Sequence, residues 1–364
     1  MKGMSVRYFS HLLQSVQHFG KSPCSLCRHV TSPKPCWASL FAVNNHGFFT
    51  KTDHAQDGPF VPRRTLMYVP GHDPRKLGKI PNLGVDCAVL ECEDGVALNK
   101  KEDARKNIKE ALSSLQIDNI DVALRVNSVS SGMMEDDLTA IIGQGLGSTL
   151  GVEQLPHTIL LPKVDSVEDL IIFTDRLQAV KLGRDYCPYL ITYVESAQGL
   201  MNMKDVLHHA TEYSKDGVYK IDGVVFGSDD FCADIGAERT LDAKELTYAR
   251  QKIVMVAKAF RIQAIDMVYV DIHDKEGLRV QSEEGARKGY TGKQVIHPGQ
   301  VAVVEAAFTP SPARVEWATE LIQGFDEHQA SGKGAFTFRG QMIDMPLLRQ
   351  AKNVLQIVKN VHPR

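Results

Sequence analysis

The sequence has no long hydrophobic run and no excess of charge of either sign. Its 364 residues carry 42 Lys and Arg against 44 Asp and Glu, which gives a formal net charge of -2. A balance this close to neutral leaves no electrostatic footprint for nucleic acid. No apolar stretch approaches the ~20 residues that a membrane-spanning helix requires. We therefore expect a soluble protein with neither a nucleic-acid nor a membrane partner, long enough for one large domain or two ordinary ones.

Glycine-rich loops that bind nucleotide phosphates are also missing. No GxGxxG pattern follows the first strand-like run, and the glycines at 143, 145 and 147 follow a helical segment instead. Gly292-Lys293 is followed by Gln294, so the Walker-type sequence GK[ST] is absent. These absences argue against a dinucleotide-binding fold and against a P-loop enzyme.

The first 52 residues contain no Asp or Glu, whereas Lys, Arg and Ser recur throughout them. A basic, serine-rich segment without acids is typical of an organellar transit peptide, and a disordered tail without a targeting role is the alternative. Residues 6–19 can form a helix with most of its apolar side chains on one side. We predict a leader over residues 1–55 that takes no part in the fold.

The cysteines do not have the spacing of a complete zinc site. Cys24-x-x-Cys27 in the leader is not followed by a second pair at a suitable distance. Four further cysteines lie in or beside apolar runs, and we expect them to be buried, reduced thiols. They are Cys87, Cys92, Cys187 and Cys232.

From residue 63 onward, short apolar runs alternate with amphipathic helical segments. Eight runs are near-continuously apolar, as strands buried on both faces should be. They cover residues 65–71, 86–94, 122–127, 157–164, 189–195, 222–230, 264–270 and 292–298. Most are followed by a helix-like segment, and Ser166 is a good N-cap for the helix after the fourth run. This alternation predicts an α/β fold, a (β/α)8 TIM barrel over residues 56–309, with a doubly wound open sheet as the alternative.

Residues 310–364 follow the eighth unit, and we call them the C-terminal extension. They contain a helix-like segment, a glycine-rich stretch and a last helix. A barrel does not need such a segment. We predict that it forms a lid, a contact between subunits, or both, with a packed extension without chemistry as the alternative.

Acidic residues stand where two of the predicted strands end. Glu195 ends the fifth run, and Asp229 and Asp230 end the sixth. The carboxyl ends of barrel strands meet at one mouth, where catalytic residues gather. Carboxylate oxygens suit Mg²⁺, which keeps open positions for water and substrate oxygens. Two buried strands with solvated acidic ends are the alternative interpretation of these residues.

Several short motifs, taken in order, resemble the citrate lyase β-subunit/malyl-CoA lyase superfamily. They are RRTLMYVPG (63–71), ECEDGV (91–96), LRVN (124–127), LPK (161–163), VESAQGL (194–200), FGSDD (226–230) and GKQVIHP (292–298). The resemblance covers about residues 62 to 309, and IDMP (343–346) extends it to the citrate lyase β-like branch. Three positions depart from the common pattern: Glu91 stands where Asp is usual, Asp229 where Glu is usual and, as a milder change, Ser196 where Thr is usual.

The resemblance implies a Mg²⁺-dependent barrel enzyme that makes or breaks a carbon–carbon bond beside a thioester. It implies that Glu195 and Asp230 bind the ion. It also implies that three further acids shape the water around the ion, namely Glu93, Asp94 and Asp229.

For the substrate, the resemblance implies that Arg125 grips a carboxylate. Asp344, in the C-terminal extension, is matched to a lid aspartate, which we predict to act as the catalytic acid or base in a closed state. Five other positions are matched to, or expected near, the CoA moiety: Tyr68, Arg75, Lys79, Asp271 and Ile272.

The reaction that the resemblance implies is cleavage of (3S)-citramalyl-CoA to acetyl-CoA and pyruvate, in a homotrimer of the mitochondrial matrix. One alternative is a transferase of the malate synthase or β-methylmalate synthase type, which condenses acetyl-CoA or propionyl-CoA with glyoxylate and hydrolyses the thioester. Another is a non-catalytic acyl-CoA-binding barrel. The clustered acids argue against the latter, because unpaired carboxylates at one mouth are costly without a cation.

Overall fold

The computed structural model describes residues 62–143, 150–330 and 336–360. The leader predicted over residues 1–55 lies outside these ranges. Within them, no helix combines the length and the apolar character needed to cross a bilayer.

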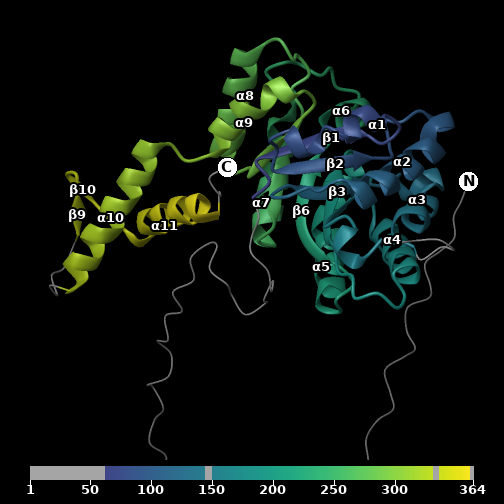
Figure 1. The fold of residues 1–364 in the computed structure, drawn as a ribbon. Coiled ribbons are helices and arrows are strands. Elements are labelled where there is room, and N and C mark those ends of the chain that lie inside the picture. The colour runs from purple at the N-terminus through teal and green to yellow at the C-terminus, as the bar shows by residue number, and fades with distance from the viewer. Residues whose placement is uncertain (1–61, 144–149, 331–335, 361–364) are drawn as a thin grey trace, which may run out of the picture. The chain divides into compact units, whose positions relative to one another are not determined.

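Eight parallel strands close into a barrel in chain order, and the last pairs with the first (Figure 1). The strands are β1 (Thr65–Pro70), β2 (Cys87–Glu91), β3 (Asp121–Arg125), β4 (Thr158–Leu161), β5 (Tyr189–Val194), β6 (Lys220–Phe226), β7 (Gln263–Asp266) and β8 (Gly292–Val295). Each strand overlaps one predicted run. The barrel is therefore confirmed, and the open sheet was the wrong alternative. Several runs end one to four residues beyond the strand, so their polar ends lie in the loops of the mouth.

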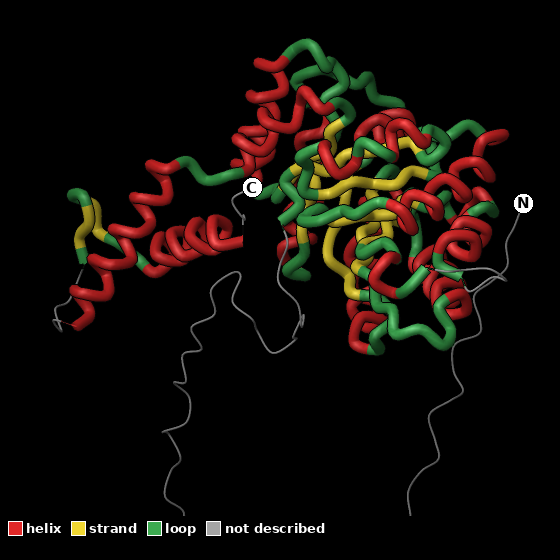
Figure 2. Tube along the Cα trace, in the orientation of Figure 1, coloured by secondary structure: helices red, strands yellow, loops and turns green. Residues whose placement is uncertain are grey.

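Helices surround the strands of the barrel (Figure 2). They are α1 (Pro74–Leu77), α2 (Lys101–Ser114), α3 (Met134–Ile141), α4 (Val167–Val180), α5 (Ala197–Lys215), α6 (Ser228–Ile235), α7 (Thr247–Ala259), α8 (Lys275–Lys288) and α9 (Val301–Phe308), with short 3₁₀ helices between some of them. The predicted N-cap of α4 is confirmed, because Oγ of Ser166 accepts the N–H of Asp169 at 3.3 Å. This cap fixes where the fourth helix begins after its strand.

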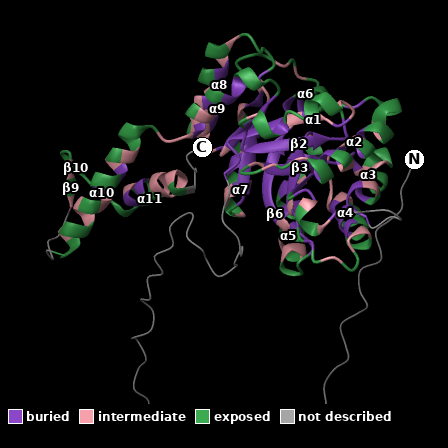
Figure 3. Cartoon of the chain, viewed as in Figure 1, coloured by how far each residue is buried: buried purple, intermediate pink, exposed green. Residues whose placement is uncertain are grey.

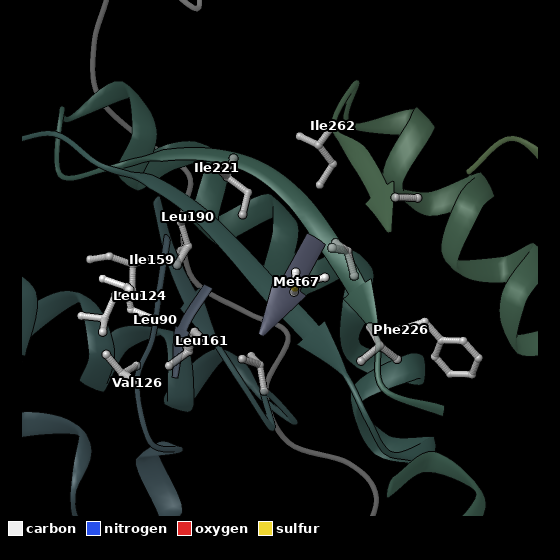
Figure 4. Close-up of a cluster of buried hydrophobic side chains, with 14 of the residues drawn as sticks. Met67, Leu90, Leu124, Val126, Ile159, Leu161, Leu190, Ile221, Phe226 and Ile262 are labelled. Carbon is white, nitrogen blue, oxygen red and sulfur yellow. The ribbon is translucent and has the colours of Figure 1, made fainter. Parts of the chain in front are cut away.

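One hydrophobic core lies between the outer face of the strands and the helices. Leu90, Leu124 and Leu161 are fully or almost fully buried there (Figure 4). Phe173 of α4 and Ile253 of α7 belong to the same core. Figure 3 shows the barrel strands coloured as buried. Burial of one such side chain contributes about 1.5–3 kcal/mol. Strand residues alternate in direction, so every second residue packs here and its neighbours point into the barrel.

The interior of the barrel is filled in layers. At the amino-terminal ends of the strands, buried Arg63 forms ion pairs with Asp121 and Asp222 and donates to Oγ1 of Thr158. Above this polar layer lies a compact apolar one, formed by Leu66, Cys87, Val89, Ala123, Leu160, Ile191, Val225 and Ile265. The barrel is thus closed below its mouth by packed side chains.

The C-terminal extension contains α10 (Pro312–Ala330), the two-stranded antiparallel sheet of β9 (Thr337–Phe338) and β10 (Gln341–Met342), and α11 (Met345–Asn360). A small apolar cluster joins the two helices and includes Leu321, Ile343 and Ala351. The two predicted helices are confirmed, and residues 337–342 between them form a short hairpin. Most of the predicted glycine-rich stretch, residues 331–335, lies outside the described residues.

Three of the four cysteines predicted to be buried are buried free thiols: Cys87, Cys92 and Cys232. The prediction is wrong for Cys187, which is exposed. It lies in the loop before β5, two residues ahead of the first strand residue, so the burial of that strand does not reach it.

Candidate active site at the barrel mouth

Glu195 follows the last residue of β5 and is buried beside neighbouring loops. One of its oxygens, Oε2, accepts the backbone N–H of Lys163 at 2.7 Å. A Cβ atom at Gly227 would lie 2.5 Å from Cγ of Glu195, so only glycine allows the loop after β6 to approach so closely. Burial, and then the charges of Glu93 and Asp230, raise the pKa of Glu195 to about 8.

Asp230 lies in the first turn of α6, directly after the strand that pairs with β5. It stands three residues after Gly227, which lies against the side chain of Glu195, so the two predicted ligands lie on adjacent loops at the same end of the barrel. The neighbouring Asp229 is placed differently. Its carboxylate is 3.6 Å from Nε of Arg239.

Glu93 and Asp94, after β2, share a counter-ion with an unusual backbone. Nζ of Lys163 is 2.5 Å from Oε1 of Glu93 and 3.1 Å from Oδ1 of Asp94. Lys163 has φ of 54°, a left-handed conformation that side chains other than glycine rarely adopt. This turn aims the N–H of Lys163 at Glu195 and its ammonium at Glu93. One residue thus contacts both parts of what we call the acidic cluster, which consists of Glu93 and Asp94 after β2 and of Glu195 and Asp230 after β5 and β6.

Arg125 ends β3 and its guanidinium is held at its edge and at its face. Nε donates to Oε2 of Glu91 at 2.6 Å, and Nη1 is 3.1 Å from Oε2 of Glu93. The guanidinium lies over the ring of Tyr68, 4.6 Å from its centroid. The predicted carboxylate grip is therefore next to the acidic cluster.

Tyr68 points into the barrel and forms the floor below Arg125. Its hydroxyl is 2.6 Å from the hydroxyl of Tyr193 and 2.6 Å from Oε1 of Gln294. Burial raises the pKa of Tyr68 well above its ordinary value, so the phenol is neutral at physiological pH.

The loop that carries Glu93 is secured from the helix that follows it. Nζ of Lys101 donates to the carbonyls of Cys92 at 2.7 Å and Glu93 at 2.8 Å, and to Oδ1 of Asn127 at 2.7 Å. These three bonds connect the loop after β2, which carries Glu93 and Asp94, with the loop that directly follows Arg125.

The mouth fits a divalent cation with few protein ligands. Among the described residues, no group of three His, Cys, Asp or Glu side chains is placed to hold a metal ion. Glu195 and Asp230 nevertheless follow adjacent strands at this mouth. Oε2 of Glu93 is buried without a hydrogen bond, although it lies in ion-pair range of Arg125. A cation with most of its shell left to water and substrate suits this set of donors.

The other residues predicted to contact CoA lie on exposed loops and on a short helix. Arg75, on α1, pairs at 3.5 Å with Asp73, and Lys79 is exposed nearby. The carboxylate of Asp271 accepts the N–H of His273 at 2.9 Å and so closes a turn that leaves Ile272 exposed. In the part of the chain that the structure describes, no hydrogen bond or ion pair joins these four residues to the acidic cluster.

Asp344 lies between β10 and α11. Its Oδ1 accepts the N–H of Leu347 at 3.1 Å, which is the geometry of a helix N-cap. None of its described hydrogen bonds or ion pairs reaches a residue of the barrel. Its predicted catalytic role therefore stays a prediction.

Four residues of the mouth were not among the predicted site residues: Glu91, Lys163, Tyr193 and Gln294. Three of them stand in motifs that matched the superfamily, and Tyr193 immediately precedes another motif. Their common signal is a polar side chain at or near the carboxyl end of an apolar strand. That signal does not say which strand residues point inward, and this decides whether they meet Arg125.

The fold and the mouth together define a parallel α/β barrel with a carboxylate cluster and an arginine at the carboxyl ends of its strands. The chain belongs to the HpcH/HpaI aldolase/citrate lyase family, whose sequence profile matches residues 64–298.

Three similar proteins bear on its chemistry. The mitochondrial citramalyl-CoA lyase of Homo sapiens is 48% identical over 327 residues, 89% of this chain and 93% of that protein. The (3S)-malyl-CoA thioesterase of Cereibacter sphaeroides is 29% identical over 283 residues, 78% of this chain and 90% of that protein. A crystal structure of CitE from Mycobacterium tuberculosis with magnesium, acetoacetate and coenzyme A has a TM-score of 0.63 and 27% identity, and the match covers 82% of this chain and 98% of that one.

Proposed function

We propose that the protein is a Mg²⁺-dependent lyase that cleaves (3S)-citramalyl-CoA to acetyl-CoA and pyruvate. The observation that carries the proposal is the position of Arg125 beside the acidic cluster, because the substrate carries a carboxylate and a hydroxyl on one carbon. The identity of the substrate is supported by the citramalyl-CoA lyase that is 48% identical over nearly the whole chain. The use of magnesium is supported by the CitE structure that contains it.

In this proposal Glu195 and Asp230 hold the ion, and Glu93 and Asp94 orient the water around it. When bound, a magnesium ion would supply positive charge that favours loss of the substrate hydroxyl proton to solvent water. Arg125 fixes the carboxylate with N–H groups of its planar fork, which a lysine would do less specifically. The bond between the hydroxyl-bearing carbon and the carbon next to the thioester then breaks, leaving a ketone and the enolate of acetyl-CoA.

The enolate requires a proton at carbon, and we assign its delivery to Asp344. The C-terminal extension would act as a lid that brings this acid to the thioester in a closed, water-poor state. None of the described hydrogen bonds or ion pairs of Asp344 reaches the barrel of its own chain, and we further propose a homotrimer in which the lid covers the mouth of a neighbouring copy.

We place the enzyme in the mitochondrial matrix. The 48% identical human relative is named as mitochondrial, and the first 52 residues combine basic and serine residues with a lack of acids. Expression of the full chain with a C-terminal fluorescent tag tests this assignment. Loss of mitochondrial signal on deletion of residues 1–55 is the expected result.

The deciding assay mixes the purified protein with citramalyl-CoA and Mg²⁺ and follows pyruvate release. We expect turnover that stops on chelation and resumes with added Mg²⁺. Glu195→Gln, which keeps the size of the side chain and removes its charge, should show no turnover. Pyruvate release that is equally fast in the chelated enzyme would exclude the metal-dependent mechanism, and no release at all would exclude the lyase.

A second candidate is a transferase of the malate synthase type, since the 29% identical relative is a (3S)-malyl-CoA thioesterase. Condensation is the reverse of the cleavage step, so the same residues serve both, and the difference is whether water then attacks the thioester. Incubation with glyoxylate and acetyl-CoA or propionyl-CoA separates the two. Malate and free CoA formed from glyoxylate and acetyl-CoA as fast as pyruvate forms in the lyase assay would favour the transferase.

A further inference from the structure

Glu91 is a buried carboxylate that the proposed reaction does not use. It ends β2 and stands directly opposite Arg125 of β3 in the strand register. Its side chain is 1% exposed, and both of its oxygens have partners. Oε2 accepts Nε–H of Arg125 at 2.6 Å, and Oε1 accepts the backbone N–H of Glu93 at 2.5 Å.

These contacts leave Arg125 with one defined free edge. Glu91 occupies Nε, Glu93 lies 3.1 Å from Nη1, and the ring of Tyr68 covers one face of the guanidinium. No described contact uses Nη2. The N–H groups of a guanidinium lie in one plane, so fixing Nε also fixes the direction in which Nη2 points.

We infer that Glu91 is a positioning residue for both Arg125 and the acidic cluster. Its bond to Nε directs Nη2 of Arg125 towards a substrate carboxylate. Its bond to the backbone N–H of Glu93 holds the acidic cluster in place beside Arg125. One carboxylate thereby ties the two halves of the site together. The inference rests on the proposed function for the role of Arg125 as a carboxylate grip.

The two bonds require a group with two acceptor oxygens. In Glu91→Gln the shape is kept, but the amide NH₂ must face either Nε–H of Arg125 or the N–H of Glu93, so one bond becomes a contact between two donors. In Glu91→Asp both acceptors remain. An aspartate readily accepts the N–H two residues ahead, and adjacent strands are ~4.8 Å apart, so a shorter carboxylate still reaches Arg125.

The test measures binding of pyruvate to the full-length protein in the presence of Mg²⁺ by titration calorimetry. We expect Glu91→Gln to weaken pyruvate binding at least about tenfold, equivalent to about 1.4 kcal/mol. The binding of Mg²⁺ alone should change less than about threefold, equivalent to about 0.65 kcal/mol, because Glu91 touches neither Glu195 nor Asp230. Glu91→Asp should keep pyruvate binding within the same threefold range.

Asp86→Asn is the matched control. Asp86 precedes the same strand and forms a buried ion pair with Arg64 at 2.8 Å, but it lies at the opposite end of the barrel. If loss of any buried carboxylate were enough, Asp86→Asn would weaken pyruvate binding as much as Glu91→Gln, and the positioning role would be wrong. The role would also be wrong if Glu91→Gln bound pyruvate as well as the wild type, or if Glu91→Asp failed as badly as Glu91→Gln.

Cleavage assays of the same proteins separate this inference from the proposed function. A wild type that binds pyruvate but does not cleave citramalyl-CoA would contradict the proposed lyase function. The pyruvate affinities of the Glu91 and Asp86 variants would then still support the role of Glu91. A wild type that cleaves citramalyl-CoA, with Glu91→Gln equally fast at low substrate, would overturn the role of Glu91 alone. A wild type without any affinity for pyruvate would contradict the inference, because Arg125 would then not be a carboxylate grip.

Discussion

Arg125 shows how much of the site depends on the shape of one side chain. Its fork meets Glu91 and Glu93 and lies on Tyr68, while Nη2 stays available. We predict that Arg125→Lys lowers kcat/KM for citramalyl-CoA at least about 100-fold, because one ammonium cannot satisfy both glutamates and a substrate carboxylate. Steady-state kinetics would measure this.

Arg64→Lys is the control for that substitution, since Arg64 also makes a buried ion pair but at the far end of the barrel. It should cost stability while leaving kcat/KM within about threefold of the wild type. Equal losses in both variants would mean that the effect reflects folding and not the site.

The raised pKa of Glu195 predicts that the stability of the metal-free protein depends on pH. Its folded pKa is about 8, raised first by burial, whereas an ordinary glutamate titrates near 4.5. Between these values the folded state binds more protons than the unfolded state, so this group's stabilisation is complete below pH 4.5 and is lost as pH rises towards 8. The melting temperature in chelator should therefore fall more from pH 6 to pH 8 in the wild type than in Glu195→Gln. The same fall in both proteins would show that Glu195 is not the group responsible.

At the scale of single elements, α11 offers a test of the lid. Asp344 caps this helix, and asparagine is as good an N-cap as aspartate but cannot donate a proton as an acid. We predict that Asp344→Asn keeps the melting temperature and Mg²⁺ binding of the wild type and loses at least about 100-fold in kcat, within the range of general acid catalysis. Asp344→Ala should lose the same activity and about 1 kcal/mol of helix stability besides. Full turnover in Asp344→Asn would reject the acid role.

The elements themselves were largely predictable. Eight apolar runs gave eight strands, and Ser166 marked the start of α4, because burial on both faces and helix capping leave local signals in the sequence. The position of Glu195 at the end of β5 was equally predictable from where its run stops.

The contacts between those elements were not predictable. The left-handed turn at Lys163 contains no glycine that would have predicted it. Ion pairs of Lys163 with Glu93 and Asp94, in the loop after β2, stabilise this turn. Asp229, whose predicted place near the metal stays a prediction, pairs with Arg239, ten residues later, and this ion pair had no local signal in the sequence. Glu91 departs from its motif, and the motif gives no sign of its two bonds, which depend on the register of β2 against β3.

At the scale of the whole molecule, the mouth predicts that magnesium stabilises the fold. In the folded chain the charges of Glu93 and Asp230 act against that of Glu195, and an unfolded chain does not hold these acids together, so the ion should bind only the folded state. At a Mg²⁺ concentration 100 times Kd, this linkage contributes about 2.7 kcal/mol, seen as a higher melting temperature. Asp230→Asn should remove most of the shift, whereas Asp326→Asn, on α10, should leave it unchanged. A shift of full size in Asp230→Asn would place the ion elsewhere.

In the described barrel, the packed interior below Arg125 leaves the mouth as the one entrance to the site. Arg63 with its two aspartates and the apolar layer above them leave no second route along the barrel axis. In the proposed reaction pyruvate rests on Arg125, beneath the bulky thioester, so acetyl-CoA must depart first and pyruvate last. Product-inhibition kinetics should then show pyruvate as a competitive inhibitor of citramalyl-CoA and acetyl-CoA as a mixed one, and the reverse pattern would show that the two products leave in the opposite order.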